Sequence, residues 1–112
     1  IIEGVNSEWY GVVLDFGNWP RTAEGTPTEE GYQGIEKLAP YTIFCHAKIR
    51  ELVLGWQGLN SYWDEKLLDY RRVMNVLRRQ GYSGYMSVEY EGKEAEETAV
   101  PKSIEFVRRL IC

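Results

Sequence analysis

The segment YTIFCHAK, residues 41–48, has the composition of a β-strand, because it is rich in β-branched and aromatic residues. Successive side chains of a strand point to opposite faces. One face of this strand would carry Ile43, Cys45 and Ala47, and the other Phe44, His46 and Lys48. The first face is apolar enough to lie under helices, and the second becomes polar toward the carboxyl end of the strand.

Two further segments have the same character, namely GVVLDF at residues 11–16 and YMSVEYE at residues 85–91. In the first, Asp15 lies on the face opposite Leu14 and Phe16. In the second, Ser87, Glu89 and Glu91 oppose Met86, Val88 and Tyr90. The sequence therefore predicts three strands, each with an apolar face and a face that turns polar near its carboxyl end.

A helix is expected after each strand. The first would begin after Thr28 as N-cap and end before Pro40. The second has apolar residues at helical spacing, Leu67, Tyr70, Val73, Met74 and Leu77, and would end at Gly81. The third would have Pro101 as its first residue, since proline is tolerated there. The predicted order is β-α-β-α-β-α.

Strands that alternate with helices pair in parallel, either in a doubly wound sheet or in a (β/α) barrel. A doubly wound sheet is apolar on both faces, whereas a barrel admits polar groups inside its carboxyl-terminal rim. The polar strand ends favour the barrel. A full barrel uses about 31 residues for each βα unit, so the 112 residues hold three units and one longer loop. We therefore predict an α/β fold with residues 1–112 as a single partial TIM-barrel domain.

Composition excludes several classes of protein. Thirteen basic and seventeen acidic residues give a net charge of −4, so binding to nucleic acid through bulk charge is not expected. The chain has no apolar run long enough to span a membrane. Two cysteines are too few for a disulfide scaffold, which favours a reduced, cytoplasmic protein.

Three side chains are candidate metal ligands, because Asp15, His46 and Glu89 each lie near the carboxyl end of a different predicted strand, on the polar face. One imidazole and two carboxylates suit a divalent ion such as Mn²⁺, Mg²⁺, Co²⁺ or Zn²⁺. Each residue also has a simpler explanation. Asp15 could cap a turn, His46 could be a core histidine, and Glu89 could be a solvated carboxylate.

The segments VLDFGN (13–18), FCHAK (44–48) and GYSGYMSVEYEG (81–92) resemble strands six, seven and eight of the sugar phosphate isomerase/epimerase superfamily of xylose isomerase-like TIM barrels. This resemblance implies that the chain forms the C-terminal three βα units of a (β/α)₈ barrel. It also implies that Asp15, His46 and Glu89 are three of four metal ligands, the fourth being a glutamate of a fifth strand outside this chain. Glu89 would in addition carry a proton to and from the substrate.

Other residues near these strand ends are candidates for substrate binding. Asn18 stands where many relatives have a histidine, which weakens the alternative of a three-metal nuclease similar to endonuclease IV. Lys48 could bind a substrate hydroxyl or phosphate, or could be an exposed strand-end lysine. Trp19 could form the floor of a sugar site, although packing is the commoner role of such a residue.

The resemblance implies a metal-dependent isomerase or epimerase of a small sugar, sugar phosphate or polyol, which moves a proton beside a carbonyl. We expect the 112-residue chain alone to be inactive. One alternative is a catalytically inactive part of a barrel that acts only by assembly with its missing N-terminal half or with copies of itself. The other is an abasic-site nuclease.

Overall fold

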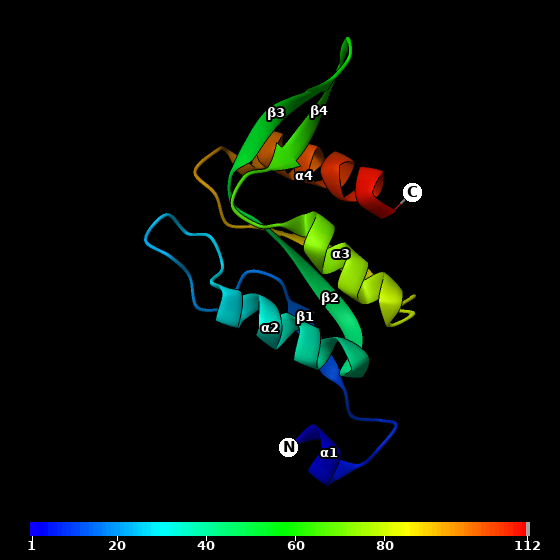
Figure 1. Cartoon of the computed structure of the whole chain (residues 1–112). Coiled ribbons are helices and arrows are strands. Elements are labelled where there is room, and N and C mark those ends of the chain that lie inside the picture. The colour runs from blue at the N-terminus through cyan, green and yellow to red at the C-terminus, as the bar shows by residue number, and fades with distance from the viewer. Residues whose placement is uncertain (112) are drawn as a thin grey trace.

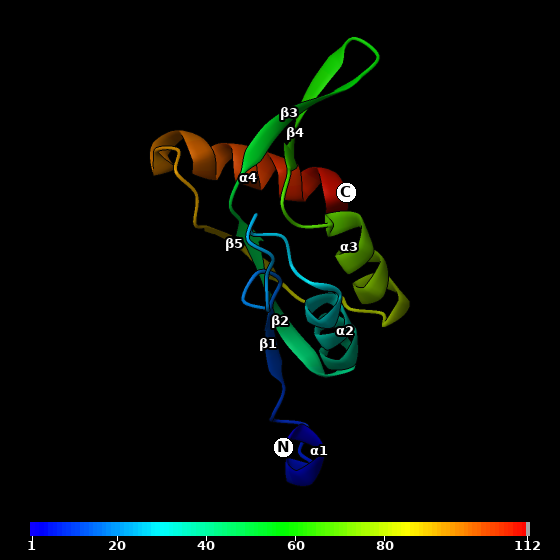
Figure 2. The same ribbon diagram turned by 60° about the vertical axis from the view of Figure 1, so that its left-hand side comes forward.

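The computed structural model describes residues 1–111, and Cys112 lies outside the described residues. A three-stranded parallel sheet forms its centre, in the order β1-β2-β5 (Figures 1 and 2). The strands are β1 (Val12–Asp15), β2 (Thr42–Ile49) and β5 (Met86–Tyr90). The three predicted strands and their parallel pairing are therefore confirmed, with each end differing by one residue.

The major helices are α2 (Glu29–Leu38), α3 (Tyr70–Arg79) and α4 (Glu96–Ile111); a short α1 (Ile2–Val5) and the 3₁₀ turn η1 (Ala39–Tyr41) complete the helical elements among residues 1–111. The core contains Leu14, Cys45, Ala47 and Ile49 from the sheet, with Ile35, Val73, Leu77 and Phe106 from the helices. One face of the sheet is thus covered by helices, as the alternation of apolar residues predicts.

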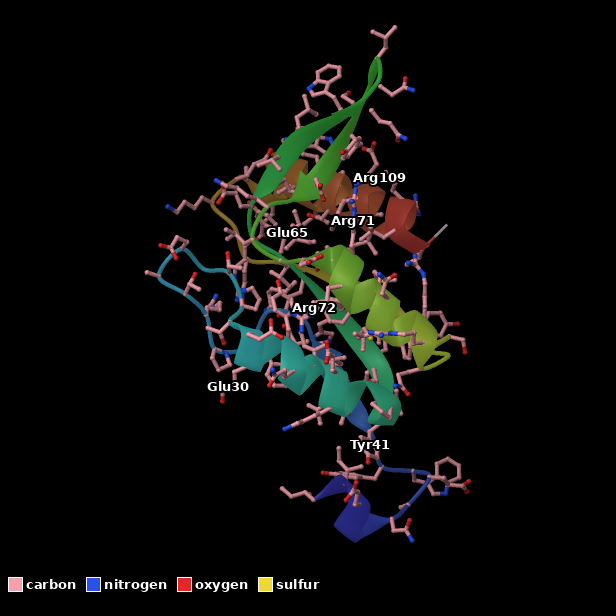
Figure 3. All side chains as sticks on the ribbon, in the orientation of Figure 1. Glu30, Tyr41, Glu65, Arg71, Arg72 and Arg109 are labelled. Atoms are coloured by element: carbon pink, nitrogen blue, oxygen red, sulfur yellow. The ribbon has the colours of Figure 1, made fainter. Side chains whose placement is uncertain are left out.

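Side-chain caps fix the beginnings of two helices. The Thr28 hydroxyl accepts a hydrogen bond from the Gly31 amide at 3.3 Å, as expected for an N-cap. Asp69 caps α3 by accepting from the Arg72 amide at 3.0 Å, so this helix begins at Tyr70. Arg72 then pairs with Glu29 of α2, which ties the two helices together. The helices α2 and α3 lie side by side (Figures 1 and 2), and the Arg72 side chain is labelled in Figure 3.

The beginning of α4 corrects one expectation. Pro101 is not the first residue of the helix, because the helix starts at Glu96 and Pro101 lies inside it. The amides of Thr98 and Ala99 donate to the Ala95 carbonyl and start the helix one turn earlier. Two glutamates in that first turn interact favourably with the helix dipole.

A β-hairpin was not expected from the sequence. Strands β3 (Leu52–Gln57) and β4 (Asn60–Glu65) follow β2 in the sequence and precede α3. They pair antiparallel and project from the body of the molecule (Figure 1). Gly58, with φ of +62°, is the first central residue of its two-residue turn. The hairpin packs on α4, where the Arg109 guanidinium lies 4.1 Å from the centre of the Tyr62 ring (Figure 3).

The described residues form an open arc rather than a closed barrel, with β1 and β5 as the two edges of the parallel sheet. This is the architecture of a partial TIM barrel. None of the helices within residues 1–111 has the length and apolar character needed to cross a membrane.

Candidate metal centre

The register of the sheet brings the three predicted ligands together. Asp15 pairs with His46 across β1 and β2, while Glu89 pairs with Lys48, two residues further along β2 than His46. The side chain of Glu89 reaches back toward His46, so one ligand atom from each of the three residues lies within 4.8 Å of the other two. Three segments far apart in the sequence therefore meet on the face of the sheet that carries no helices.

Asp15 is oriented by the turn that follows its strand. Its Oδ1 atom accepts hydrogen bonds from the amides of Gly17 at 2.8 Å and Asn18 at 3.1 Å. These bonds leave Oδ2 facing the site, where it is buried and has no hydrogen-bond partner in the described structure. Asp15 thus caps a turn with one oxygen and presents the other to the cluster, which combines the two roles considered from the sequence.

His46 is a partly exposed member of the cluster and not a core histidine, because 38% of its side chain is accessible. Its Nδ1 atom lies 3.7 Å from Asp15 Oδ2 and 3.6 Å from Glu89 Oε2. Phe44 packs against the imidazole edge-on, with ring centres 5.7 Å apart. The imidazole therefore stands between the two carboxylates and is supported by an aromatic ring on one side.

The side chain of Lys48 is buried, which the sequence did not predict. Only 1% of its side chain is exposed, which rules out an exposed strand-end lysine. Its Nζ atom lies 2.8 Å from Glu89 Oε2, 2.9 Å from Glu91 Oε1 and 3.5 Å from Asp15 Oδ2. The ammonium group is thus buried against three carboxylates.

These contacts change the acid strength of the groups involved. Burial alone would lower the pKa of Lys48, but the carboxylates of Glu89, Glu91 and Asp15 outweigh it and raise the pKa. The positive charge of the Lys48 ammonium, 2.8 Å from Glu89 Oε2, is the main cause that lowers the pKa of Glu89. Both groups are therefore charged at neutral pH, and Glu89 is available as a ligand or as a base.

Two further residues, which sequence reasoning did not assign to the site, surround Lys48. Glu91 accepts from Lys48 through Oε1 and from Arg50 Nη2 through Oε2, at 2.9 and 3.1 Å. Arg50 also donates to the Gly17 carbonyl at 3.0 Å. A Cβ atom at Gly17 would collide with the Lys48 side chain, so glycine is needed for the lysine to pass. In the sequence, the signal that pointed to Glu91 was its position two residues after Glu89, on the same face of the strand.

The two other predicted substrate contacts lie at the margin of the cluster. Asn18 is exposed beside Asp15. The Trp19 indole donates to the Asp15 carbonyl at 2.8 Å, and its ring lies against Gly34 of α2. Trp19 therefore packs against the helix, which is the simpler role considered for it, and its place in the floor of a sugar site stays a prediction.

The donor set fits a divalent cation. Asp15 Oδ2 and Glu89 Oε2 are buried atoms without a hydrogen bond, although Glu89 Oε2 lies close to Lys48 in a direction unsuited to one. Carboxylate oxygens and an imidazole nitrogen are ligands that Mn²⁺, Mg²⁺, Co²⁺ and Zn²⁺ accept. A cavity of about 550 Å³ lies beside Arg50 and Glu91, and none of the three candidate ligands lines it.

Comparisons with known proteins agree with the fold. A search of curated proteins gives no match to the chain. The profile of the xylose isomerase-like TIM barrel family matches residues 1–110, which is nearly the whole length. Since this match covers the three parallel strands and the cluster at their carboxyl ends, the chain belongs to the xylose isomerase-like TIM barrel family.

Proposed function

We propose that the barrel containing this chain is a divalent-metal-dependent isomerase or epimerase of a small sugar, sugar phosphate or polyol. The convergence of Asp15, His46 and Glu89 at the carboxyl ends of parallel strands is the main support. Membership of the xylose isomerase-like family supports the same class of reaction in a coarser way. Active sites of TIM barrels lie at this end of the strands.

In this proposal Asp15, His46 and Glu89 hold the ion. When bound, the ion polarises the carbonyl and hydroxyl oxygens of the substrate. Glu89 is the proton carrier, since 44% of its side chain is accessible from the open face and Lys48 keeps its carboxylate ionised. It can accept a proton from the carbon beside the carbonyl. Asn18, which is exposed next to Asp15, is a proposed hydrogen-bond partner for a substrate hydroxyl.

The remaining parts of the site are expected to come from other strands. A fourth ligand, a glutamate, would be supplied by the rest of the barrel or by an associated chain. The proposal also includes a cytoplasmic location, where a thiol such as the buried Cys45 stays reduced.

Metal binding is the first test. Mn²⁺ binding is measured by electron paramagnetic resonance and by calorimetry for the wild-type chain, Asp15→Asn and His46→Gln, with the exposed Glu105→Gln on α4 as a control. We expect each site variant to lose at least ~10-fold in affinity, because one anionic or imidazole ligand is removed from a small donor set. The control should bind like the wild type.

Activity is tested on a closed barrel that contains this chain. Incorporation of solvent deuterium is followed in ketoses, ketose phosphates and keto-polyols, since proton transfer at carbon exchanges the transferred hydrogen with solvent. Exchange that depends on added metal supports the proposal. Cleavage of abasic DNA without such exchange would favour the nuclease, and metal binding with neither activity would favour a barrel segment that acts by assembly.

A further inference from the structure

Lys48 lies inside the candidate metal centre and not beside it. Its ammonium group contacts Asp15 Oδ2 and Glu89 Oε2, the same two oxygens that are buried without a hydrogen bond. With 1% of the side chain exposed, the ammonium has no access to solvent and none to a substrate in the bulk. A role in binding substrate hydroxyls therefore does not fit its position.

Lys48 belongs to a network of ion pairs that includes three carboxylates and one guanidinium group. The ammonium lies within 3.5 Å of carboxylate oxygens of Asp15, Glu89 and Glu91, and Glu91 is bound in turn by Arg50. An ammonium ion buried without carboxylates would be strongly unfavourable, and so would the buried oxygens without a cation. Lys48 thus neutralises the carboxylates in the absence of any metal ion.

A divalent ion held by Asp15 and Glu89 would meet this ammonium at short range. Like charges a few ångströms apart repel strongly where water is excluded. Glu91 offers Lys48 an alternative partner, because its Oε1 atom already accepts a hydrogen bond from Nζ at 2.9 Å. The lysine can therefore give up Asp15 and Glu89 without being left unpaired.

Resting on the metal site proposed above, we propose that Lys48 is a built-in counter-ion that competes with the divalent ion for Asp15 and Glu89, and that Glu91 retains the ammonium when the ion binds. Lys48 is a positioning residue in this scheme, since it acts only through the two carboxylates. It keeps the cluster folded without metal and lowers the affinity for the ion. Removing its charge should therefore weaken the metal-free fold and tighten metal binding.

The test compares Lys48→Met with Lys66→Met, a matched control that removes the same charge from a pair outside the cluster, since Lys66 contacts Glu51 at 2.9 Å on the surface. Mn²⁺ affinity and the thermal midpoint with and without Mn²⁺ are measured for both variants and the wild type. Lys48→Met should bind Mn²⁺ at least ~10-fold more tightly and melt at a lower temperature without metal. Lys66→Met should resemble the wild type in both measurements.

A second variant examines the role of Glu91. Glu91→Gln leaves Lys48 with fewer anionic partners, so the ammonium should be held more firmly by Asp15 and Glu89, and Mn²⁺ affinity should fall. Glu94→Gln in the same loop is the control for the loss of a nearby negative charge, since Glu94 pairs with Lys102. In the Lys48→Met background, Glu91→Gln should have no more effect than Glu94→Gln.

The outcomes separate this proposal from the function on which it rests. If neither the wild type nor Lys48→Met binds Mn²⁺, the proposed metal site is wrong. If the wild type binds and Lys48→Met binds equally or less tightly, only the counter-ion proposal is overturned. If Lys48→Met binds Mn²⁺ and the wild type does not, both the metal site and the counter-ion proposal are supported. Should Lys48→Met not fold, equal Mn²⁺ affinities of Glu91→Gln and Glu94→Gln would overturn it.

Discussion

Asp15 and His46 face each other across the β1–β2 pairing, with 3.7 Å between Oδ2 and Nδ1. Two independent features produce this relationship. The sheet register places the two residues side by side, and the amides of Gly17 and Asn18 hold the other carboxylate oxygen away from the imidazole. The geometry of this half of the cluster is therefore set by the backbone.

The two carboxylates should respond differently to substitution. Asp15→Asn removes a ligand charge, so we expect its main effect on metal affinity. Glu89→Gln removes the proposed base as well, and should lower solvent-deuterium exchange by about 10²-fold in a closed barrel saturated with metal. Metal titrations and exchange rates for both variants make the comparison. Near-normal exchange by saturated Glu89→Gln would show that Glu89 is a ligand only.

Glu65 at the base of the hairpin should be important for stability (Figure 3). Its buried carboxylate accepts hydrogen bonds from the amides of Arg50 at 2.7 Å, Glu51 at 3.1 Å and Leu67 at 2.7 Å. Glu65→Gln replaces one acceptor oxygen by a donor that faces an amide. The variant should be destabilised by about 1–3 kcal/mol in urea denaturation at pH 5. The exposed Glu105→Gln should change stability by less than about 0.5 kcal/mol.

The same residue predicts a dependence of stability on pH. Burial is the main cause that raises the pKa of Glu65 above its ordinary value of 4.5. A group with a raised pKa in the folded state contributes stability that is complete below its unfolded pKa and is lost as pH rises through its folded pKa. The stability difference between the wild type and Glu65→Gln should therefore shrink as pH rises from 4.5. A difference that grows over this range would contradict the assignment.

Tyr70 links the helix layer to the sheet beneath the site. Its buried hydroxyl donates to the Lys48 carbonyl at 2.7 Å, and its ring packs edge-on against Phe16 and Phe106. Tyr70→Phe keeps the ring and removes one hydrogen bond, so a loss of about 1 kcal/mol is expected. Mn²⁺ affinity should stay unchanged, since the hydroxyl touches none of the ligand side chains. A large loss of affinity would mean that Tyr70 also sets the position of β2.

Gly34 in α2 should not tolerate alanine, although alanine normally stabilises a helix by up to about 1 kcal/mol. A Cβ atom at this position would enter the ring of Trp19, which is held by a hydrogen bond to the Asp15 carbonyl. We expect Gly34→Ala to destabilise the chain by about 1–3 kcal/mol in thermal or chemical unfolding. Combining it with Trp19→Leu should recover part of the loss, and additive losses would exclude this clash.

The open edges of the sheet predict association. In the described residues β1 and β5 are each paired on one side only, and unpaired strand edges tend to join other chains. We expect the purified chain to form dimers or larger assemblies in sedimentation velocity experiments, or to bind a complementary part of the barrel. A compact monomer with cooperative melting would contradict this expectation.

The sequence predicted the parallel strands and the meeting of Asp15, His46 and Glu89, because strand periodicity and parallel topology act over short, regular stretches. It did not predict the burial of Lys48. Alternation gives the face on which a side chain lies, but its burial depends on Gly17 and Glu91, which come from other parts of the chain.

Elsewhere the sequence was misleading for physical reasons. The hairpin at residues 52–65 lies where a barrel normally has a loop, and its strands pair only with each other in the described structure. Pro101 suggested a helix start because proline suits that position, yet the carbonyl of Ala95 starts the helix one turn earlier. In the structure α4 packs against both strands of the hairpin and against β5.

The register of the β1–β2 pairing shifts by one residue between Val12 and Val13, and this shift marks a position where β2 can lose a residue. Val12 pairs with Thr42 but Val13 pairs with Phe44, so Ile43 is passed over. Deleting Ile43 would close the ladder into a regular one and leave Asp15 opposite His46. Deleting Cys45 would instead shift His46 by one position and send the imidazole toward the helices. The chain can thus lose Ile43 without moving His46 away from Asp15.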